Sequence, residues 1–133
     1  MPSETDQGDL PLEIRSKIWI ERGTEVVLSE WRVALLEAID AHGSLSRAAT
    51  ALNVPYRTAW DRVKETEAAL GMRLLETESG GADGGGSRLT SEARDLCHRF
   101  RRVSGGIQEV VTRRFAAEFG ELSKEKYSVP PTR

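Results

Sequence analysis

The chain has 133 residues, of which 38% are hydrophobic and 30% are charged, a balance typical of one domain with a modest core. No stretch approaches the ~18 consecutive apolar residues of a membrane span, and the polar start predicts no secretory signal. The lone Cys97 excludes an intrachain disulfide and suits a reducing cytoplasm. The formal net charge of −2 argues mildly against nucleic-acid binding, because contact with phosphates is largely electrostatic.

The first predicted element is a β-hairpin. Residues 1–9 are polar and are expected to form a disordered tail. Apolar residues then alternate from Leu12 to Ile20, and this period of two predicts a half-buried strand. The pattern breaks at Gly23 and resumes at residues 26–28, which predicts a second strand. Ser29 follows as a plausible N-cap of the first helix.

A helix-turn-helix is predicted between Gly43 and Gly71, in the stretch GSLSRAATALNVPYRTAWDRVKETEAALG. Gly43 ends a preceding helix, and Ser44 or Ser46 caps the short one that follows. Asn53 tolerates the left-handed backbone of a tight turn. The longer helix then occupies residues 55–70 and would enter a DNA major groove. The inward positions of the three helices are Trp31, Leu35, Leu36, Ile39, Ala48, Ala49, Leu52, Ala59, Val63 and Leu70.

The glycine-rich stretch GGADGGGSRLT, residues 80–90, is typical of the tip and return strand of a wing, so residues 73–90 are predicted to form the wing. Short strands are expected at residues 73–77 and 87–90, on either side of the tip. Gly81 and Gly86 have the spacing of a phosphate-binding loop, but the lysine that this motif requires is absent. A flexible linker is the competing interpretation, although apolar residues on each side favour pairing of the two arms.

A last helix is predicted to begin after Thr90 as its N-cap. Gly105 and Gly106 fall within this helix and predict a kink or an end there, since each costs about 1 kcal/mol relative to alanine. Apolar residues recur at heptad-like spacing, which favours packing on the domain and on a second copy: Leu96, Phe100, Val103, Ile107 and Val110. The domain is expected to span residues 10–122, with a polar tail at residues 123–133.

The candidate DNA-binding residues lie on the helix-turn-helix and the wing, where basic residues gather within a slightly acidic chain. Arg57 and Arg62 suit guanine as bidentate donors, and Asp61 could accept from cytosine or hold a neighbouring arginine. Glycines at the wing tip would let backbone N–H groups approach phosphate. The full set is Ser46, Arg47, Tyr56, Arg57, Thr58, Asp61, Arg62, Lys64, Gly84, Gly85, Gly86 and Arg88.

Other chemistry has little support in the sequence. Trp60, next to Ala59 in mid-helix, is expected to be a partly buried packing residue and not a base-stacking one. Cys97 and His98 are adjacent on a helix and point about 100° apart, so they cannot form a nucleophile–base pair. No metal-ligand spacing occurs, so neither an enzyme nor a cofactor site is predicted.

With these motifs the chain resembles the N-terminal DNA-binding domain of molybdate-responsive ModE-type transcription regulators. More distantly, it is similar to the winged helix-turn-helix of LysR-type regulators. The matching pieces are IWIERGTEVVLS, ALLEAIDAHGSLSRAATAL, YRTAW, LGMRLLET and GGADGGGSRLT, within residues 12–102. The resemblance implies a mainly α fold with small β structure: a winged helix-turn-helix with an N-terminal β-hairpin and a long C-terminal dimerisation helix.

The resemblance also implies a cytoplasmic homodimer that binds double-stranded DNA. Its recognition helices, residues 56–70, would face successive major grooves about 34 Å apart. Pro55 replaces a serine common in the family, and Asp83 stands where the wing often carries a basic residue. No molybdate site is apparent in this chain. These departures and the net charge leave an alternative open, a winged-helix adaptor that binds protein and has weak or lost DNA binding.

Overall fold

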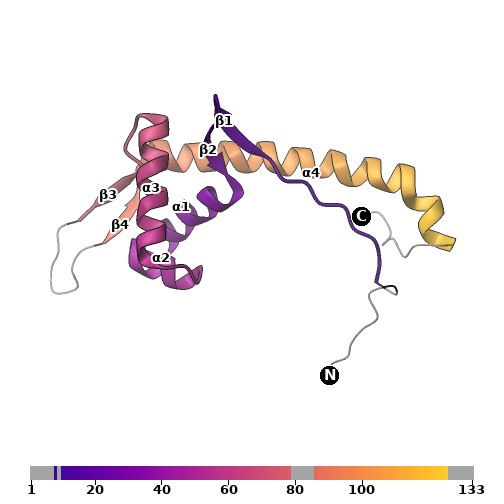
Figure 1. Ribbon diagram of the computed structural model, residues 1–133, viewed down its shortest axis with the longest axis horizontal. Helices are drawn as coiled ribbons and strands as arrows, with labels where there is room; N and C mark the ends of the chain where they lie inside the picture. Colours follow the sequence, from indigo (N-terminus) through magenta and orange to yellow (C-terminus); the bar gives the residue numbers. More distant parts are fainter. Residues whose placement is uncertain (1–7, 9, 79–85, 126–133) are drawn as a thin grey trace, which may run out of the picture. The chain divides into compact units, whose positions relative to one another are not determined.

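The computed structural model describes residues 8, 10–78 and 86–125, with side chains described as far as residue 120. It confirms the predicted fold, mainly α with small β structure (Figure 1). Residues 1–7 and 9 of the expected tail, Gly84, Gly85 and residues 126–133 lie outside the described part. The elements are β1 (Trp19–Arg22), β2 (Glu25–Ser29), α1 (Glu30–His42), α2 (Leu45–Ala51), α3 (Tyr56–Leu70), β3 (Leu75–Thr77), β4 (Ser87–Leu89) and α4 (Ser91–Glu125).

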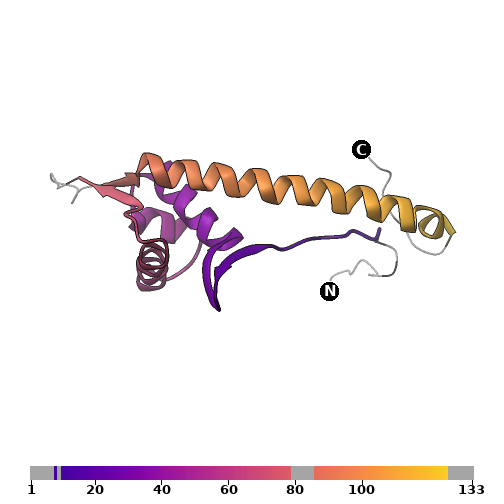
Figure 2. The same ribbon diagram turned by 90° about the horizontal axis from the view of Figure 1, so that it is seen from above.

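Two compact units make up the chain, and residues 18–102 form the larger one. In this unit α1 packs on α2, α3, β2 and β4, and α3 also packs on α2 and β2. Figure 2 shows α3 nearly end-on, and α3 is joined to α2 by the short turn of the helix-turn-helix. The largest fully buried side chains of the core are Phe100, Leu35, Leu36, Ile39, Leu74 and Val33.

The predicted helix ends are confirmed by the hydrogen bonds. Ser29 Oγ accepts from the backbone N–H of Arg32 at 3.2 Å and caps α1. Gly43 ends α1 with φ +83° and donates its N–H to Ile39 O at 2.8 Å. Of the two candidate caps of α2, it is Ser44 whose side chain accepts, from the Arg47 N–H at 3.0 Å.

The turn between α2 and α3 has the geometry that its sequence predicts. Asn53 is left-handed with φ +59°, and among the described residues it is the one non-glycine with positive φ. The next N–H, of Val54, donates to Ala49 O at 3.0 Å and closes the turn. Pro55 stands just before α3, and its lack of a side-chain donor or acceptor leaves the start of α3 without a side-chain cap.

The N-terminal hairpin is shorter than predicted, because β1 begins at Trp19 and not at Leu12. Its antiparallel partner β2 has five residues and ends where α1 begins, and Trp19 pairs with Ser29, the last residue of β2. The pairing with β2 therefore does not extend to the alternating residues before Trp19. In the other unit, residues 1–17 and 103–133, Ser16 instead donates its N–H and Oγ to the side-chain oxygen of Gln108.

Helix α4 does not end at the glycine pair. It runs as one 35-residue helix through Gly105 and Gly106, neither of which has a positive φ. Thr90 caps it as predicted, because Thr90 Oγ1 accepts from Ala93 N–H at 3.1 Å. None of the described helices, α4 included, has a stretch that is both long and apolar enough to cross a bilayer.

The wing is anchored on the end of α1 by its backbone. Ser87 N–H donates to Gly43 O at 2.8 Å, which brings the start of β4 against the C-terminus of α1. At Gly86 a Cβ atom would stand 2.8 Å from the same carbonyl oxygen, closer than real Cβ atoms approach backbone. Gly86 is therefore required by a close backbone approach, and not only by the flexibility of a wing tip.

We expect Gly86→Ala to lower the free energy of unfolding by about 1–3 kcal/mol, because backbone must move to admit the methyl group. Gly105→Ala is the matched control, since a Cβ there meets nothing within 4 Å and the residue lies inside α4. The control should raise stability by about 0.5–1 kcal/mol. Urea unfolding followed by circular dichroism measures both. Equal effects of the two substitutions would contradict the close approach.

Candidate nucleic-acid interface

Helix α3 has one buried face and one open face. The buried residues, Ala59, Val63, Thr66 and Ala69, follow the spacing that turns an α-helix into an amphipathic element. The opposite face bears Arg57, Trp60, Asp61 and Lys64, and none of these belongs to the core. A long, charged helix face that no other described element covers is what a DNA groove requires.

The charged residues of this open face are paired with one another. Arg57 Nε lies 3.3 Å from Asp61 Oδ1, one helical turn on, and the Arg57 side chain is 80% exposed. Lys64 Nζ lies 3.3 Å from Glu67 Oε1. Three basic residues of α3 (Arg57, Arg62, Lys64) match three acidic ones (Asp61, Glu65, Glu67), so the helix carries no net charge.

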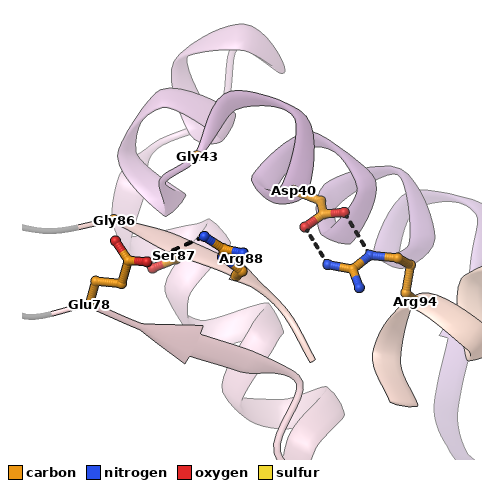
Figure 3. A pocket seen from close by; sticks show the side chains of 7 residues that line it. All are labelled: Asp40, Gly43, Glu78, Gly86, Ser87, Arg88 and Arg94. Atoms are coloured by element: carbon orange, nitrogen blue, oxygen red, sulfur yellow. Dashed lines mark hydrogen bonds and ion pairs between the residues drawn. The ribbon is translucent and has the colours of Figure 1, made fainter. Parts of the chain in front are cut away.

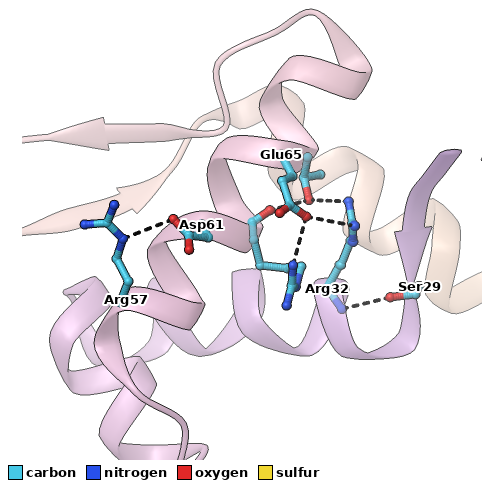
Figure 4. Close-up of polar contacts among 7 residues, drawn as sticks. Ser29, Arg32, Arg57, Asp61 and Glu65 are labelled. Atoms are coloured by element: carbon cyan, nitrogen blue, oxygen red, sulfur yellow. Dashed lines mark hydrogen bonds and ion pairs between the residues drawn. The ribbon is translucent and has the colours of Figure 1, made fainter.

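Arg62 lies on a different side of α3 from Arg57. The two residues are five apart and therefore about 140° apart around the helix. Arg62 Nη1 bonds Glu65 Oε1 at 2.9 Å, and its guanidinium lies 5.7 Å from the centre of the Trp31 ring of α1. The structure thus does not bring the two predicted guanine readers together. Figure 4 shows the Arg57–Asp61 pair on one side of α3 and the Glu65 cluster on the other.

Arg32 of α1 completes this second cluster and fixes α3 to α1. Its guanidinium donates to Thr66 Oγ1 at 3.0 Å and to Glu65 at 3.5 Å, and Thr66 Oγ1 in turn donates to Arg62 O at 2.8 Å. The Arg32 side chain is 13% exposed, and this burial lowers its pKa while the Glu65 charge acts in the opposite direction. The cluster is structural, because most of its polar groups are directed at one another.

The expectation that Trp60 packs in the protein holds only in part. Its ring is 38% exposed, and it lies outside the buried core. The Arg57 guanidinium stands 5.4 Å from the ring centre, and Lys64 Nζ stands 5.5 Å from it. Trp60 is therefore an aromatic residue of the open face, held between two cations.

The remaining predicted residues frame this face. Ser46 and Arg47 are exposed on α2, and Arg47 forms no ion pair within the described residues. Tyr56, at the start of α3, is 53% exposed, while Thr58 is half-buried. The basic positions thus extend from α2 along the first turns of α3.

A concave surface separates α3 from the wing. Its lining includes Tyr56, Trp60, Lys64, Arg73, Thr77 and Ser87. The two sides of the concavity are fixed relative to each other. Glu67 Oε2 accepts the N–H of Leu74 at 2.9 Å and so holds the start of the wing against α3. Arg73, which was not among the predicted contact residues, supplies the concavity with a second cation.

Asp40 anchors the other side of the wing. Arg94 Nε and Nη2 donate to the two Asp40 carboxylate oxygens at 3.1 and 3.2 Å (Figure 3). Leu89 N–H also donates to Asp40 Oδ1, at 3.0 Å. The hydrogen bond from Arg94 lowers the pKa of Asp40, although partial burial acts against it. One carboxylate thus joins α1, β4 and α4. Nearby, Arg88 of the wing pairs with Glu78 at 3.3 Å.

Sequence reasoning missed Asp40, Arg94 and Arg73, for different reasons. Asp40 and Arg94 are 54 residues apart, and no local pattern marks their pairing. Arg73 stands beside a predicted strand, and the direction of a side chain there depends on the register of the wing. Trp60 did carry a signal, since Arg57 and Lys64 lie three residues before it and four after it, where helical side chains meet.

The described residues also bear on thiol reactivity and on metal binding. Cys97 is buried in the core, and this burial raises its pKa to about 11, so the thiol is not poised to react. Within residues 8, 10–78 and 86–125 no group of three His, Cys, Asp or Glu side chains could hold a metal ion.

Comparison with known proteins finds similarity to bacterial regulators in the part of the chain that contains this interface. Residues 32–94 match the profile of the bacterial regulatory helix-turn-helix protein, lysR family. The molybdenum transport protein ModE of Azotobacter vinelandii is 30% identical over 98 residues, which are 74% of this chain and 36% of that protein. The transcriptional regulator ModE of Haemophilus influenzae is 40% identical over 65 residues, 49% of this chain and 26% of that protein.

The comparison with solved structures supports the same fold. The crystal structure of the CbnR_DBD–DNA complex superposes with a TM-score of 0.53 at 24% identity, over 66% of this chain and 95% of that one. The chain spans about a third of the length of its ModE relative from Azotobacter vinelandii.

We expect stability to depend on pH through Asp40. Because the folded-state pKa of Asp40 is lowered, its contribution is present above the unfolded-state value of about 4 and is lost as the pH falls through the folded-state pKa. Asp40→Asn should therefore lower the free energy of unfolding at pH 7, and its difference from the wild type should shrink toward pH 2. Denaturation at a series of pH values measures this.

The exposed Glu109, changed to Gln, is the control for removal of one negative charge. A difference between the wild type and Asp40→Asn that stays constant from pH 7 to pH 2 would contradict the anchoring role of the carboxylate.

Proposed function

We propose that the chain is a sequence-specific DNA-binding transcription regulator, because residues 32–94 match the profile of the bacterial regulatory helix-turn-helix protein, lysR family. Helix α3 enters the major groove, and the wing contacts the backbone or the minor groove. The observation that carries the proposal is the open face of α3, where Arg57 is 80% exposed on the side opposite the core. We place this activity in the cytoplasm and assign it to a domain that comprises residues 10–122, which draws on both compact units.

The ion pairs of α3 make DNA binding an exchange of partners. Arg57 must leave Asp61 to reach a base edge, and Lys64 must leave Glu67 to reach a phosphate. Exposed ion pairs contribute about 0–1 kcal/mol to stability. Breaking them therefore costs less free energy than a charge-assisted hydrogen bond to DNA provides. The neutral helix is therefore compatible with binding, and Arg47 and Arg73 add cations at its two sides.

Arg57 is the stronger candidate for base readout. It projects from the second residue of α3, and an arginine can donate two hydrogen bonds to guanine O6 and N7. Arg62 is 34% exposed and is engaged with Glu65 and Trp31, so we assign it to the backbone at the edge of the groove. Asp61 then has two roles: it holds Arg57 in the free protein and can accept from cytosine in the complex.

We further propose that the chain acts as a homodimer through α4. Val103, Ile107 and Val110 are 54%, 38% and 47% exposed and recur at heptad-like spacing, whereas Phe100 of the same seam is buried in the core. An exposed apolar stripe on a helix favours burial against another copy. Two recognition helices would then read two-fold-related half-sites about 34 Å apart. No effector or molybdate role is assigned to this chain.

A protein-binding adaptor is the second candidate. The net charge of −2 and the neutral α3 favour it, because a surface that does not attract phosphate serves other partners equally well. Salt dependence separates the two candidates. Release of counterions makes DNA affinity fall steeply with salt, whereas a response that stays flat between 50 and 200 mM (about the range over which DNA binders weaken sharply) favours the adaptor.

We expect Arg57→Ala to weaken binding to a selected site by about tenfold or more, which corresponds to one lost bidentate base contact. Arg99→Ala is the matched control, because Arg99 also forms an i, i+4 ion pair on a helix surface, with Asp95 on α4. Selection from random DNA followed by titration in a mobility-shift assay measures both. An Arg57→Ala protein that selects the same site with unchanged affinity would contradict the readout.

Asp61→Asn should strengthen binding to non-specific DNA by about two- to fivefold, because it gives α3 a net positive charge and frees Arg57. Discrimination between the selected site and other sequences should fall at the same time. Asp95→Asn removes the equivalent acidic partner from α4 and should change neither quantity. Fluorescence anisotropy with labelled duplexes provides the measurement, and weaker binding by Asp61→Asn would contradict the proposed exchange of partners.

A further inference from the structure

Trp60 is a large apolar side chain placed where a helix that reads DNA ordinarily displays polar groups. Its ring is 38% exposed and lines the concave surface between α3 and the wing. Tyr56, one helical turn earlier and 53% exposed, lines the same surface. Two neighbouring aromatic residues therefore form an apolar wall on the part of α3 that the proposed function directs at the duplex.

The ring is held in place before any DNA arrives. Arg57 and Lys64 contact it at 5.4 and 5.5 Å from the ring centre, and cation–π contacts of this kind favour one orientation. Val63 below it belongs to the core and is 2% exposed, which supports the position of the helix itself. A fixed aromatic surface loses little conformational entropy when it binds, so it is suited to recognition.

The residues around the Trp60 ring indicate the chemical class of the partner that would bind over it. Lys64 and Arg73 are positive, and Tyr56, Thr77 and Ser87 add hydroxyl groups. Glu67, the acidic residue that also lines this surface, is 18% exposed and is engaged by Lys64 and by the N–H of Leu74. Leu45, Val63 and Leu75 add apolar surface beside the ring. An apolar centre that carries Lys64, Arg73 and three hydroxyl groups around it fits a polyanion that has an apolar group.

Duplex DNA has one such group in its major groove. Base edges there are hydrogen-bond donors and acceptors, and the exception is the 5-methyl group of thymine. The bases of an intact duplex are stacked, so the ring cannot insert between them without a kink. We propose that Trp60 is a specificity-determining residue that selects thymine in each half-site by covering this methyl group. The proposal rests on the proposed function, because it requires α3 to lie in the groove.

The test changes one methyl group of the DNA. After a site has been selected with the wild-type protein, each thymine is replaced in turn by deoxyuridine, which removes the methyl group and keeps every hydrogen bond. We expect one thymine in each half-site to show a loss of affinity of about fourfold, the effect of about one buried CH₂ group. The other thymines should show little change.

The same pair of duplexes is then offered to Trp60→Ala and Trp60→Gln, two substitutions that keep helix-forming side chains and remove the ring. Both variants should bind the thymine and deoxyuridine duplexes equally. Trp19→Ala is the matched control, since Trp19 is 49% exposed on β1 and does not line the concave surface. It should retain the fourfold preference. Circular dichroism establishes that each variant is folded, and if one is not, the other provides the comparison.

The possible failures are distinct. A wild-type protein that selects no DNA site contradicts the proposed function and the role of Trp60 with it. A protein that selects a site but binds every deoxyuridine duplex as tightly as thymine contradicts only the methyl contact. A thymine preference that persists in a folded Trp60 variant assigns the contact to another residue and overturns the role of Trp60.

Discussion

The arrangement of the proposed DNA-binding surface depends on how the wing is attached to the helix-turn-helix. Asp40 near the end of α1 accepts hydrogen bonds from Arg94 of α4 and from the backbone of Leu89 in β4. One residue beyond that end, Gly43 O accepts from Ser87 N–H, and Gly86 leaves room for this approach. On the other side of the wing, Glu67 accepts from Leu74 N–H. The β3 arm of the wing is thereby fixed to α3, which presents most of the candidate binding residues, and the β4 arm is fixed to α1 and α4.

Much of this structure could be predicted from local sequence. Ser29, Ser44, Gly43, Asn53 and Gly71 stand where caps and a tight turn require them, and each has the predicted geometry. Such residues act on backbone within four positions of themselves, so one sequence is enough to place them. The fold class followed from the same signals together with the resemblance to a family.

The interactions that were missed act over longer range. The Asp40–Arg94 pair closes across 54 residues, and neither residue differs locally from other charged helix residues. The sequence predicts an earlier start of β1 than the structure has. Alternation of apolar residues indicates a strand, but it does not indicate how far the partner strand extends. The expectation for Trp60 holds only in part, because its 38% exposure depends on how α3 packs on α1 and α2 and not on sequence spacing alone.

The paired charges of α3 bear on specificity more than on affinity. A helix with unpaired arginines binds any phosphate backbone, and the competition from non-specific DNA in a genome is large. Here each basic residue of α3 has an acidic neighbour, and the acidic side chains repel phosphate wherever the basic ones find no better partner. In the proposed function, a sequence that offers Arg57 a base edge and Trp60 an apolar contact compensates for the lost pairs better than other sequences do. The acidic residues of the open face would thus weaken binding to DNA sequences that lack the matching contacts. Specificity arises in this way when a protein disfavours the competing partners as well as favouring the correct one.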